Sequence, residues 1–380
     1  MSGPLHGINV IELAGIGPAP MAGQLLADLG ADVISIDRHA EARLPERPKD
    51  ANRRGKRSIV LDLKNSDAVD VVRKLAAGAD LFFEGFRPGV AERLGLGPDV
   101  LLKANPKLVY GRLTGWGQTG PLSQRAGHDI NYIALSGALG TMGGKDQPVP
   151  PLNLVGDYAG GSLFLIVGML AALVRARETG EGQVVDAAMT DGSAAIMSLI
   201  HSLLASGLWS DGRETNLLDG SAPFYRTYVT ADGGHMAVGA IEPQFFAALL
   251  DGLGVDSSEA AHQYDREHWP RLTEVFAARF AARKRDDWTQ HFSATDACVT
   301  PVLSLKEAPL HAHNTARRTF ETRDGFVQPA PAPRFSQTPA ETGRGPFFAG
   351  EDTREILAQA GFDDAGITSL INSGAAAESS

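Results

Sequence analysis

Two short apolar runs separated by a helix-length segment constrain the fold of this chain most. The mostly apolar stretch 8–13 is followed by a glycine- and proline-rich break at 15–20, by helical periodicity at 21–29 and by a second apolar stretch at 33–36. A strand, a helix and a strand in this order predict a βαβ unit with parallel strands. Because parallel sheets carry helices on their faces, we expect an α/β domain.

The same alternation continues along the first half of the chain. Further strands are expected at 58–61, 81–84, 108–113 and 184–188, and further helices at 67–77, 130–139 and 157–177. The pattern predicts a mostly parallel sheet with buried strands.

A change of pattern near residue 208 predicts a second domain. Periodicity fades over 208–222, and the runs 225–230 and 235–240 flank the turn sequence Ala231–Gly234, as in a hairpin. Helices at 243–253 and 272–283 would complete a smaller α+β domain. We therefore expect a large domain at 1–190, a linker at 191–224, a small α+β domain at 225–300, a return linker at 301–340, C-terminal helices at 341–373 that return to the large domain, and a disordered tail at 374–380.

Composition limits the classes of partner and the compartment. The net charge of −10 argues against a nucleic-acid partner, so an anionic ligand would need local positive charge. The single cysteine, Cys298, excludes an intrachain disulfide, and no basic-then-apolar N-terminal signal is present, so a cytoplasmic location is expected. The apolar run 159–174 has 16 residues, fewer than the ~20 of a bilayer span, so we predict no membrane partner.

Basic residues gather after predicted strands. Arg38 follows the second strand, the loop 53–57 holds four cations and no acid, and Arg87 follows the strand at 81–84. Open α/β sheets bind ligands at the carboxyl ends of their strands, so these cations suggest a ligand with several phosphates, although a solvated charged face is the alternative. A dinucleotide site at Gly15-x-Gly17 matches incompletely, because its third glycine is misplaced.

His128 and Asp157 are the candidate proton carriers. Each lies in a glycine-lined segment, at 127–132 and 156–161, where a ligand could approach the backbone. The alternative for such a histidine is a structural hydrogen bond. Patterns of serine hydrolases, zinc peptidases and P-loops are absent, and His311 and His313 lack nearby thiolates or matching acids, so we expect no metal and favour metal-free acid–base chemistry.

Seven ordered sequence blocks resemble the family III CoA-transferase superfamily, and most closely its α-methylacyl-CoA racemase branch. They lie at 7–13, 25–33, 54–64, 86–90, 115–121, 127–132 and 156–157. The resemblance implies a Rossmann-like large domain that binds CoA, a small domain, and two chains interlocked as a homodimer. It also implies that CoA is part of the substrate, an acyl-CoA thioester, so no separate cofactor is expected.

The resemblance also implies roles for individual residues. Asp157 matches the nucleophilic carboxylate of the transferases, whereas His128 is typical of the racemases. In a racemase the two would flank the α-carbon of a 2-methylacyl-CoA, and Glu242 of the other subunit would orient His128; otherwise Glu242 is simply an acid favoured at a helix start. The expected CoA-binding residues are Arg38, Arg54, Lys56, Arg57, Arg87, Asp129 and Tyr132.

Three functions follow from this resemblance. The preferred one is racemisation of (2R)- and (2S)-2-methylacyl-CoA in branched-chain fatty acid or sterol side-chain metabolism. The alternatives are CoA transfer between acids through a covalent intermediate on Asp157, and non-catalytic acyl-CoA binding. The sequence does not specify the acyl chain, since apolar pockets discriminate weakly per methylene.

Overall fold

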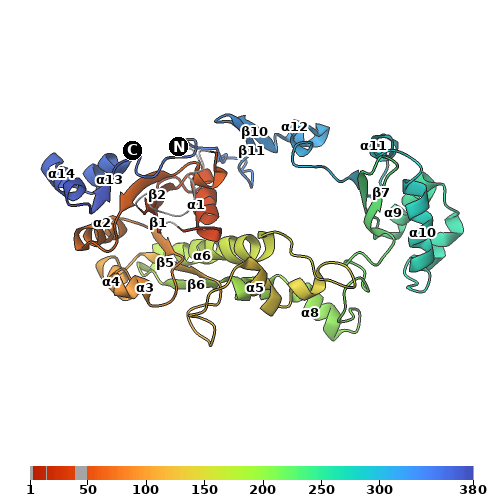
Figure 1. Cartoon of the computed structure of the whole chain (residues 1–380), viewed down its shortest axis with the longest axis horizontal. Coiled ribbons are helices and arrows are strands. Elements are labelled where there is room, and N and C mark those ends of the chain that lie inside the picture. Colours follow the sequence, from red (N-terminus) through yellow and green to blue (C-terminus); the bar gives the residue numbers. More distant parts are fainter. Residues whose placement is uncertain (1–2, 14, 39–48, 380) are drawn as a thin grey trace. The chain divides into compact units, whose positions relative to one another are not determined.

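The chain forms two compact units. The computed structural model describes residues 3–13, 15–38 and 49–379 (Figure 1). The large unit comprises Met1–Ser136, Leu152–Ile196 and His313–Ser380, and the small unit comprises Gly137–Pro151 and Met197–Ala312. Each unit has its own hydrophobic core.

A seven-stranded sheet forms the centre of the large unit. Its order is β12–β3–β2–β1–β4–β5–β6, and every neighbouring pair is parallel except β12 and β3. The sheet confirms the α/β prediction. The strands are β1 (Asn9–Leu13), β2 (Asp32–Asp37), β3 (Arg57–Leu61), β4 (Leu81–Glu84), β5 (Val109–Thr114), β6 (Val184–Ala188) and β12 (Ala376–Ala377).

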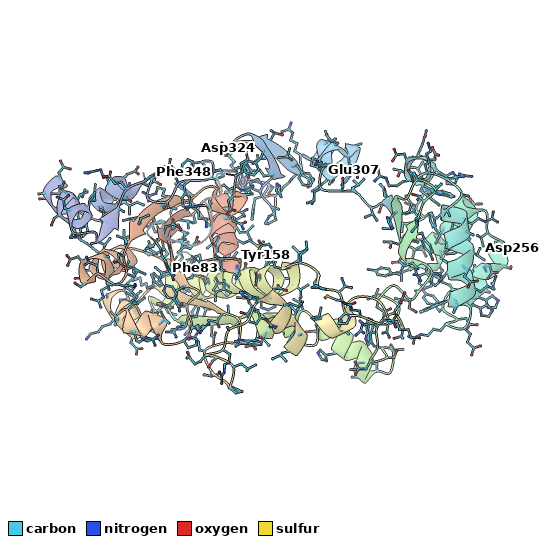
Figure 2. All side chains as sticks on the ribbon, viewed as in Figure 1. Phe83, Tyr158, Asp256, Glu307, Asp324 and Phe348 are labelled. Carbon is cyan, nitrogen blue, oxygen red and sulfur yellow. The ribbon has the colours of Figure 1, made fainter. Side chains whose placement is uncertain are left out.

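Helices cover both faces of this sheet. Alternate residues of β1 point to opposite faces, so Ile11 joins a core with α2, α13 and α14, while Val10 joins a core with α1 and α6. Phe83 on β4 is fully buried in the second core (Figure 2). The helices of the unit are α1 (Pro18–Asp28), η1 (Ala51–Arg53), α2 (Ser66–Ala77), α3 (Val90–Arg93), α4 (Pro98–Ala104), α5 (Asp129–Leu135), η3 (Leu154–Leu163), α6 (Phe164–Thr179), α7 (Met189–Ala195), α13 (Thr353–Gln359) and α14 (Asp364–Asn372).

The sheet order creates a switch point between β1 and β4. From β1 the chain builds outward to β2 and β3 on one side, and later to β4, β5 and β6 on the other. In open α/β sheets, ligands bind in the crevice outside the carboxyl ends of the strands at such a point. The loops that follow β1 and β4 are therefore the first place to look for a site.

One helix of the large unit is longer than its apolar run indicated. The π-helix η3 continues into α6, and the combined helix Leu154–Thr179 has 26 residues, which by length and composition is enough to cross a membrane. The helix therefore extends beyond both the apolar run 159–174 and the predicted range 157–177 at each end. However, α6 packs on β5 and β6 and contributes Leu165 and Met169 to the core, so it is a helix of the α/β unit.

The small unit is built on an antiparallel sheet, which confirms the α+β prediction. The strands pair in the order β7–β8–β9, and helices pack on them around an aromatic core that includes Phe224, Phe246 and Phe276. Its elements are η2 (Leu139–Thr141), α8 (Ser198–Ala205), β7 (Tyr225–Val229), β8 (His235–Gly239), α9 (Pro243–Leu253), η4 (Ser257–His262), α10 (Trp269–Phe280), α11 (Arg285–Phe292), β9 (Val299–Pro301) and η5 (Ala308–Leu310).

Segments expected as linkers or tail contain regular structure. The expected linker 191–224, in which the sequence predicted a helix from Ser193 onward, holds part of α7 and all of α8. The expected return linker 301–340 holds α12 (Ala312–Arg317) and the hairpin of β10 (Phe320–Arg323) and β11 (Phe326–Pro329). The expected disordered tail contributes β12, where the buried Ala376 pairs with Leu61. Two alanines carry no strand signal of their own, so this pairing depends on the sheet edge that accepts them. Ser380 lies outside the described residues.

Candidate active site

Asp157 lies at the start of the π-helix η3 and is half-buried. Its backbone N–H donates to Oδ2 of Asp129 at 2.7 Å, and Nδ2 of Asn153 donates to its own Oδ2 at 3.3 Å. Burial raises the pKa of the Asp157 carboxyl; the Asn153 hydrogen bond lowers it, Asp129 raises it, and His128 lowers it. A carboxyl group with a raised pKa both accepts and returns a proton more readily near neutral pH.

His128 precedes α5 and is exposed. Its backbone N–H donates to Oδ1 of Asn131 at 3.1 Å, so the polar residue in the first turn of α5 fixes the backbone at the imidazole. Asp129, the next residue in the chain, accepts the Asp157 N–H, and α5 packs on η3, so the two candidate proton carriers lie in adjoining segments. The segments 127–132 and 156–161, separated in sequence, therefore meet in the large unit.

Asp129 joins these two segments. Its side chain is 7% exposed, and Oδ2 accepts the Asp157 N–H, whereas Oδ1 has no hydrogen-bond partner among the described residues. A Cβ on Gly156 would lie 2.5 Å from Asp129 Oδ2, so only glycine leaves room for this carboxylate. The contact identifies Asp129 as a residue that positions Asp157; its predicted contact with CoA stays a prediction.

Tyr132 packs beneath the same region. Its hydroxyl donates to the Gly127 carbonyl oxygen, and its ring meets Trp116 edge-on with centroids 4.8 Å apart. A Cβ on Gly115 would lie 2.1 Å from the Tyr132 ring. Burial raises the Tyr132 pKa, with Asp157 raising it further and Arg87 lowering it, so Arg87 also lies near the site. The predicted CoA contact of Tyr132 stays a prediction; its hydroxyl is bonded to the Gly127 carbonyl oxygen.

The loop after β1 reaches Asp157. Gly17 has φ +75°, and a Cβ there would lie 2.9 Å from Asp157 Oδ2. Farther along the π-helix, Ser162 Oγ donates to the Pro18 carbonyl oxygen at 2.7 Å. The glycine- and proline-rich segment thus lies against the candidate acid, and Pro18 opens α1, a position where its missing N–H costs nothing.

Two of the expected CoA-binding cations are turned into the protein. Arg54 is 2% exposed and makes a two-point contact with Asp28 at 3.0 and 2.6 Å, and Lys56 is 1% exposed with its Nζ 2.7 Å from Glu12 Oε2. This burial differs from the basic loop that the sequence led us to expect at a ligand. The charge run along 53–57 could not indicate it, because the acidic partners come from α1 and β1.

The remaining cations divide into paired and unpaired groups. Arg57 contacts Asp32 at 3.0 and 2.5 Å and Gln359 at 2.6 Å. Arg38 and Arg87 are exposed after β2 and β4, and neither forms an ion pair within the described ranges 3–13, 15–38 and 49–379. Arg38 lies over the Phe86 ring, 5.7 Å from its centroid. These two side chains are the better-placed candidates for phosphate contact.

Glu242 belongs to the small unit, where it is exposed directly before α9. Pro243 follows it as the first residue of the helix, so Glu242 occupies the N-terminal position at which a carboxylate is favoured. Its predicted role as a partner of His128 from another subunit stays a prediction.

Some residues near the site were missed at the sequence level. Asn153 contacts Asp157, and Glu84 is buried at the end of β4, where burial raises its pKa to about 7. A charged residue closing an apolar strand was the available signal for Glu84. No motif marks Asn153, because its contact with Asp157, four residues later, forms only when η3 winds as a helix.

Comparison with known proteins agrees with this geometry. The family described as CoA-transferase family III matches residues 5–353. Alpha-methylacyl-CoA racemase from Mus musculus is 48% identical over 371 residues, 96% of each chain, and that from Homo sapiens is 47% identical over 364 residues, 94% of each chain. Succinyl-CoA:glutarate CoA-transferase from Mus musculus is 29% identical, covering 98% of this chain and 90% of its own.

A solved structure of a CAIB/BAIF family protein from Brucella suis shares the fold. It superposes with a TM-score of 0.80 at 26% identity, and the match covers 95% of this chain and 100% of that one. The resemblance drawn from the sequence blocks is thereby confirmed: the chain belongs to CoA-transferase family III.

Proposed function

We propose that this protein is an α-methylacyl-CoA racemase that interconverts (2R)- and (2S)-2-methylacyl-CoA. The observation that carries the proposal is the hydrogen bond by which Asp129 joins the segments of His128 and Asp157, beside the loop that follows β1 at the switch point of the sheet. The high identity to proteins named alpha-methylacyl-CoA racemase over nearly the whole chain supports the choice of reaction.

The reaction moves one proton off C2 and another onto its opposite face. One of His128 and Asp157 accepts the C2 proton, and the electron pair of the broken C–H bond passes into the thioester carbonyl to give an enolate. The other group then donates its proton to the opposite face of C2. Backbone N–H groups at the start of the π-helix are candidates to stabilise the enolate oxygen.

Substrate binding at this site needs positive charge for the CoA phosphates. Arg38 and Arg87 meet this requirement best, because both are exposed after strands that flank β1. The proposed acyl chain is that of a branched fatty acid or a sterol side chain. The compartment proposed is the cytoplasm.

The active form is proposed to be an interlocked homodimer in which Glu242 of one subunit orients His128 of the other. Apolar side chains left exposed on α6 support a partner chain: Val167 is 67% exposed and Val174 is 63% exposed. Exposed apolar residues that recur along one helix are typical of a protein interface.

A single incubation separates the racemase from the transferase. A pure enantiomer of a 2-methylacyl-CoA is incubated with the protein in D₂O, with and without a dicarboxylic acid as CoA acceptor. The racemase proposal predicts deuterium at C2 together with a mixture of both configurations, and no CoA ester of the acceptor. Retained configuration together with CoA transfer to the acceptor would instead assign the chain to the transferases, whose chemistry uses a carboxylate as nucleophile.

A further inference from the structure

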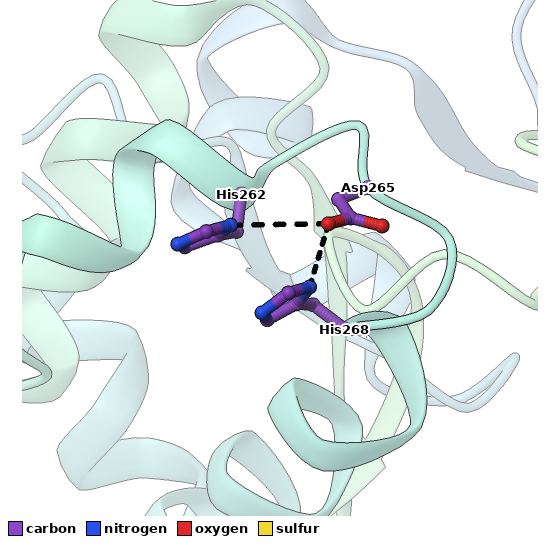
Figure 3. Close-up of side chains that lie close together, drawn as sticks. All are labelled: His262, Asp265 and His268. Atoms are coloured by element: carbon purple, nitrogen blue, oxygen red, sulfur yellow. Dashed lines mark ion pairs between the residues drawn. The ribbon is translucent and has the colours of Figure 1, made fainter.

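Two histidines and one aspartate converge on a turn of the small unit. His262 ends η4, His268 precedes α10, and Asp265 lies between them (Figure 3). The three ligand atoms lie within 4.8 Å of one another, and both Nδ1 atoms face the same Asp265 oxygen, at 3.9 Å for His262 and 2.7 Å for His268. We propose that this His262–Asp265–His268 cluster binds a transition-metal dication such as Zn²⁺.

The orientation of His268, rather than its distance from Asp265, leaves a nitrogen available for a metal. His268 Nδ1 is buried and has no hydrogen-bond partner in the described part of the chain, although it lies 2.7 Å from the Asp265 carboxylate. Metal–ligand bonds of about 2.0–2.1 Å place neighbouring ligand atoms roughly 3.0–3.4 Å apart. The observed separations of 2.7 and 3.9 Å lie on either side of that range. The two imidazole rings are stacked with their centroids 4.1 Å apart and an interplanar angle of 13°, so one ring must turn before both Nδ1 lone pairs point at the same ion.

The backbone that carries the ligands is fixed by buried neighbours. Trp269, 4% exposed, donates from Nε1 to the Gln263 carbonyl oxygen at 2.8 Å, and Gln263 is itself 2% exposed. Backbone hydrogen bonds join Asp265 N–H to the His262 carbonyl oxygen and His268 N–H to the Asp265 carbonyl oxygen. A site held this way loses little freedom when an ion binds, which favours affinity.

The donor set indicates the class of ion. Two imidazole nitrogens and one carboxylate oxygen suit zinc, copper, nickel or cobalt, whereas magnesium and calcium prefer oxygen ligands alone. The three side chains are 35–44% exposed, so an ion can enter from solvent, and a water molecule can complete four-coordination.

The turn also holds the backbone before Glu242. Gln263 Nε2 donates to the Ile241 carbonyl oxygen at 2.6 Å, and the Tyr264 hydroxyl donates to the same atom at 2.6 Å. An ion on the neighbouring side chains would therefore stiffen the segment that carries Glu242. This second consequence, unlike the metal site itself, rests on the proposed function.

Zinc titration of the full chain, without a histidine tag and after treatment with a chelator, tests the site. We expect about one Zn²⁺ per chain by isothermal titration calorimetry, and a melting temperature that rises with zinc concentration because the ion binds the folded state. His268→Ala and Asp265→Asn should each weaken binding at least about tenfold. The double variant His311→Gln/His313→Gln, which removes two histidines outside the turn, should bind zinc as the wild type does.

Circular dichroism shows whether each variant folds. If His268→Ala or Asp265→Asn does not fold, His262→Gln takes its place in the titration, because the His262 side chain is 44% exposed and its replacement disturbs the fold least. Absence of saturable zinc binding to the wild type, or binding that survives loss of all three ligands, would overturn the proposal. For the second consequence, zinc should slow amide hydrogen exchange at Ile241 and Glu242 in the wild type only. Zinc binding and hydrogen exchange are both measured without racemase activity. A negative result in either one therefore leaves the proposed function untouched, and loss of the proposed function leaves the metal site untouched.

Discussion

The Glu84 carboxyl group is 2% exposed at the end of β4, and burial raises its pKa from 4.5 to about 7. The Phe86 N–H donates to it at 2.6 Å and Arg112 lies 4.0 Å away, but these contacts do not offset the loss of water. Because the folded pKa exceeds the unfolded one, the folded state holds the proton more tightly. The stabilising contribution is complete below about pH 4.5 and is lost as the pH rises through 7.

Glu84→Gln should therefore stabilise the protein in alkaline solution. The free energy of unfolding should exceed that of the wild type by up to about 3 kcal/mol at pH 8, and by little at pH 4.5. Glu92→Gln is a matched control for which the effect on stability should have the opposite sign, a loss at pH 8. Burial would raise the Glu92 pKa, but the hydrogen bond from Arg112 and the other favourable contacts outweigh burial and lower that pKa. Denaturant unfolding at both pH values checks the prediction, and a pH-independent difference for Glu84→Gln would contradict it.

Arg38 and Arg54 should respond differently to replacement by alanine. Arg38→Ala should weaken CoA-ester binding, and the loss should shrink as salt rises, since exposed charges are screened. Arg54→Ala should instead cost about 3–5 kcal/mol of stability, because it leaves Asp28 buried without its partner. Calorimetric binding and denaturant unfolding of both variants separate the two effects; unchanged CoA binding by Arg38→Ala at low salt would remove Arg38 from the site.

For single residues, the sequence identified which side chains belong to the candidate site better than it predicted whether a charged side chain is buried. The blocks containing His128 and Asp157 were identified, and the structure brings them together. The inward direction of Arg54 and Lys56 could not be predicted, because it depends on Asp28 and Glu12, which are distant in the sequence. Whether a charged side chain is buried depends on which helices and strands pack around it, and neighbouring residues in the sequence do not determine this.

At the scale of elements, the π-helix η3 packs on α7 with almost no side chain between the backbones. A Cβ on Gly192 would lie 1.9 Å from the Gly160 carbonyl oxygen, and one on Gly160 would lie 2.7 Å from the Ser193 backbone nitrogen. This close approach sets the position of the helix that carries Asp157. The i to i+5 hydrogen bonding of a π-helix is rare and is frequent at functional sites.

Gly192→Ala should push these two helices apart. We expect a loss of stability of about 1–3 kcal/mol or more, as for overpacking of a close contact, together with reduced racemase activity because Asp157 moves. Gly78→Ala is the control, since a Cβ there meets only the Leu75 carbonyl oxygen at 3.8 Å. Thermal unfolding and the racemase assay measure both effects; a Gly192→Ala variant with wild-type stability and activity would disprove the role of the contact.

Periodicity predicted the helices and strands that are specified by their own apolar residues. The buried parallel strands and amphipathic helices were found because their apolar residues recur at the correct spacing. The strand β12 and the hairpin of β10 and β11 were missed, since short polar or alanine-rich strands depend on the partner that accepts their hydrogen bonds. The helix containing Asp157 was predicted at 157–177 and runs from Leu154 to Thr179, so only its ends differ.

At the scale of the whole molecule, the main prediction is the homodimer, and no local sequence pattern supports it. Nothing in the periodicity of one chain indicates interlocking, which comes only from the family resemblance. The exposed apolar face of α6, including Phe164, Val167 and Val174, offers a surface on which to test it.

Analytical ultracentrifugation should find the wild-type chain as a dimer at micromolar concentration. Val167→Asp should shift it toward the monomer, because a charge in an apolar interface loses its water without a partner. Val100→Asp, at an apolar residue of α4 that is 41% exposed, should leave the dimer intact. A fully active wild-type monomer would contradict both the dimer and a contribution of Glu242 from a second subunit.

The account rests most on the division of labour between His128 and Asp157, and hydrogen exchange from each pure enantiomer in D₂O tests it directly. His128→Ala and Asp157→Asn should each slow inversion in both directions by roughly 10²–10⁴-fold, since every turnover uses both groups. Each variant should still exchange the C2 proton of one enantiomer, and the two variants should prefer opposite enantiomers. Equal loss of exchange from both enantiomers in both variants, with CoA binding retained, or full inversion by either one, would contradict the mechanism.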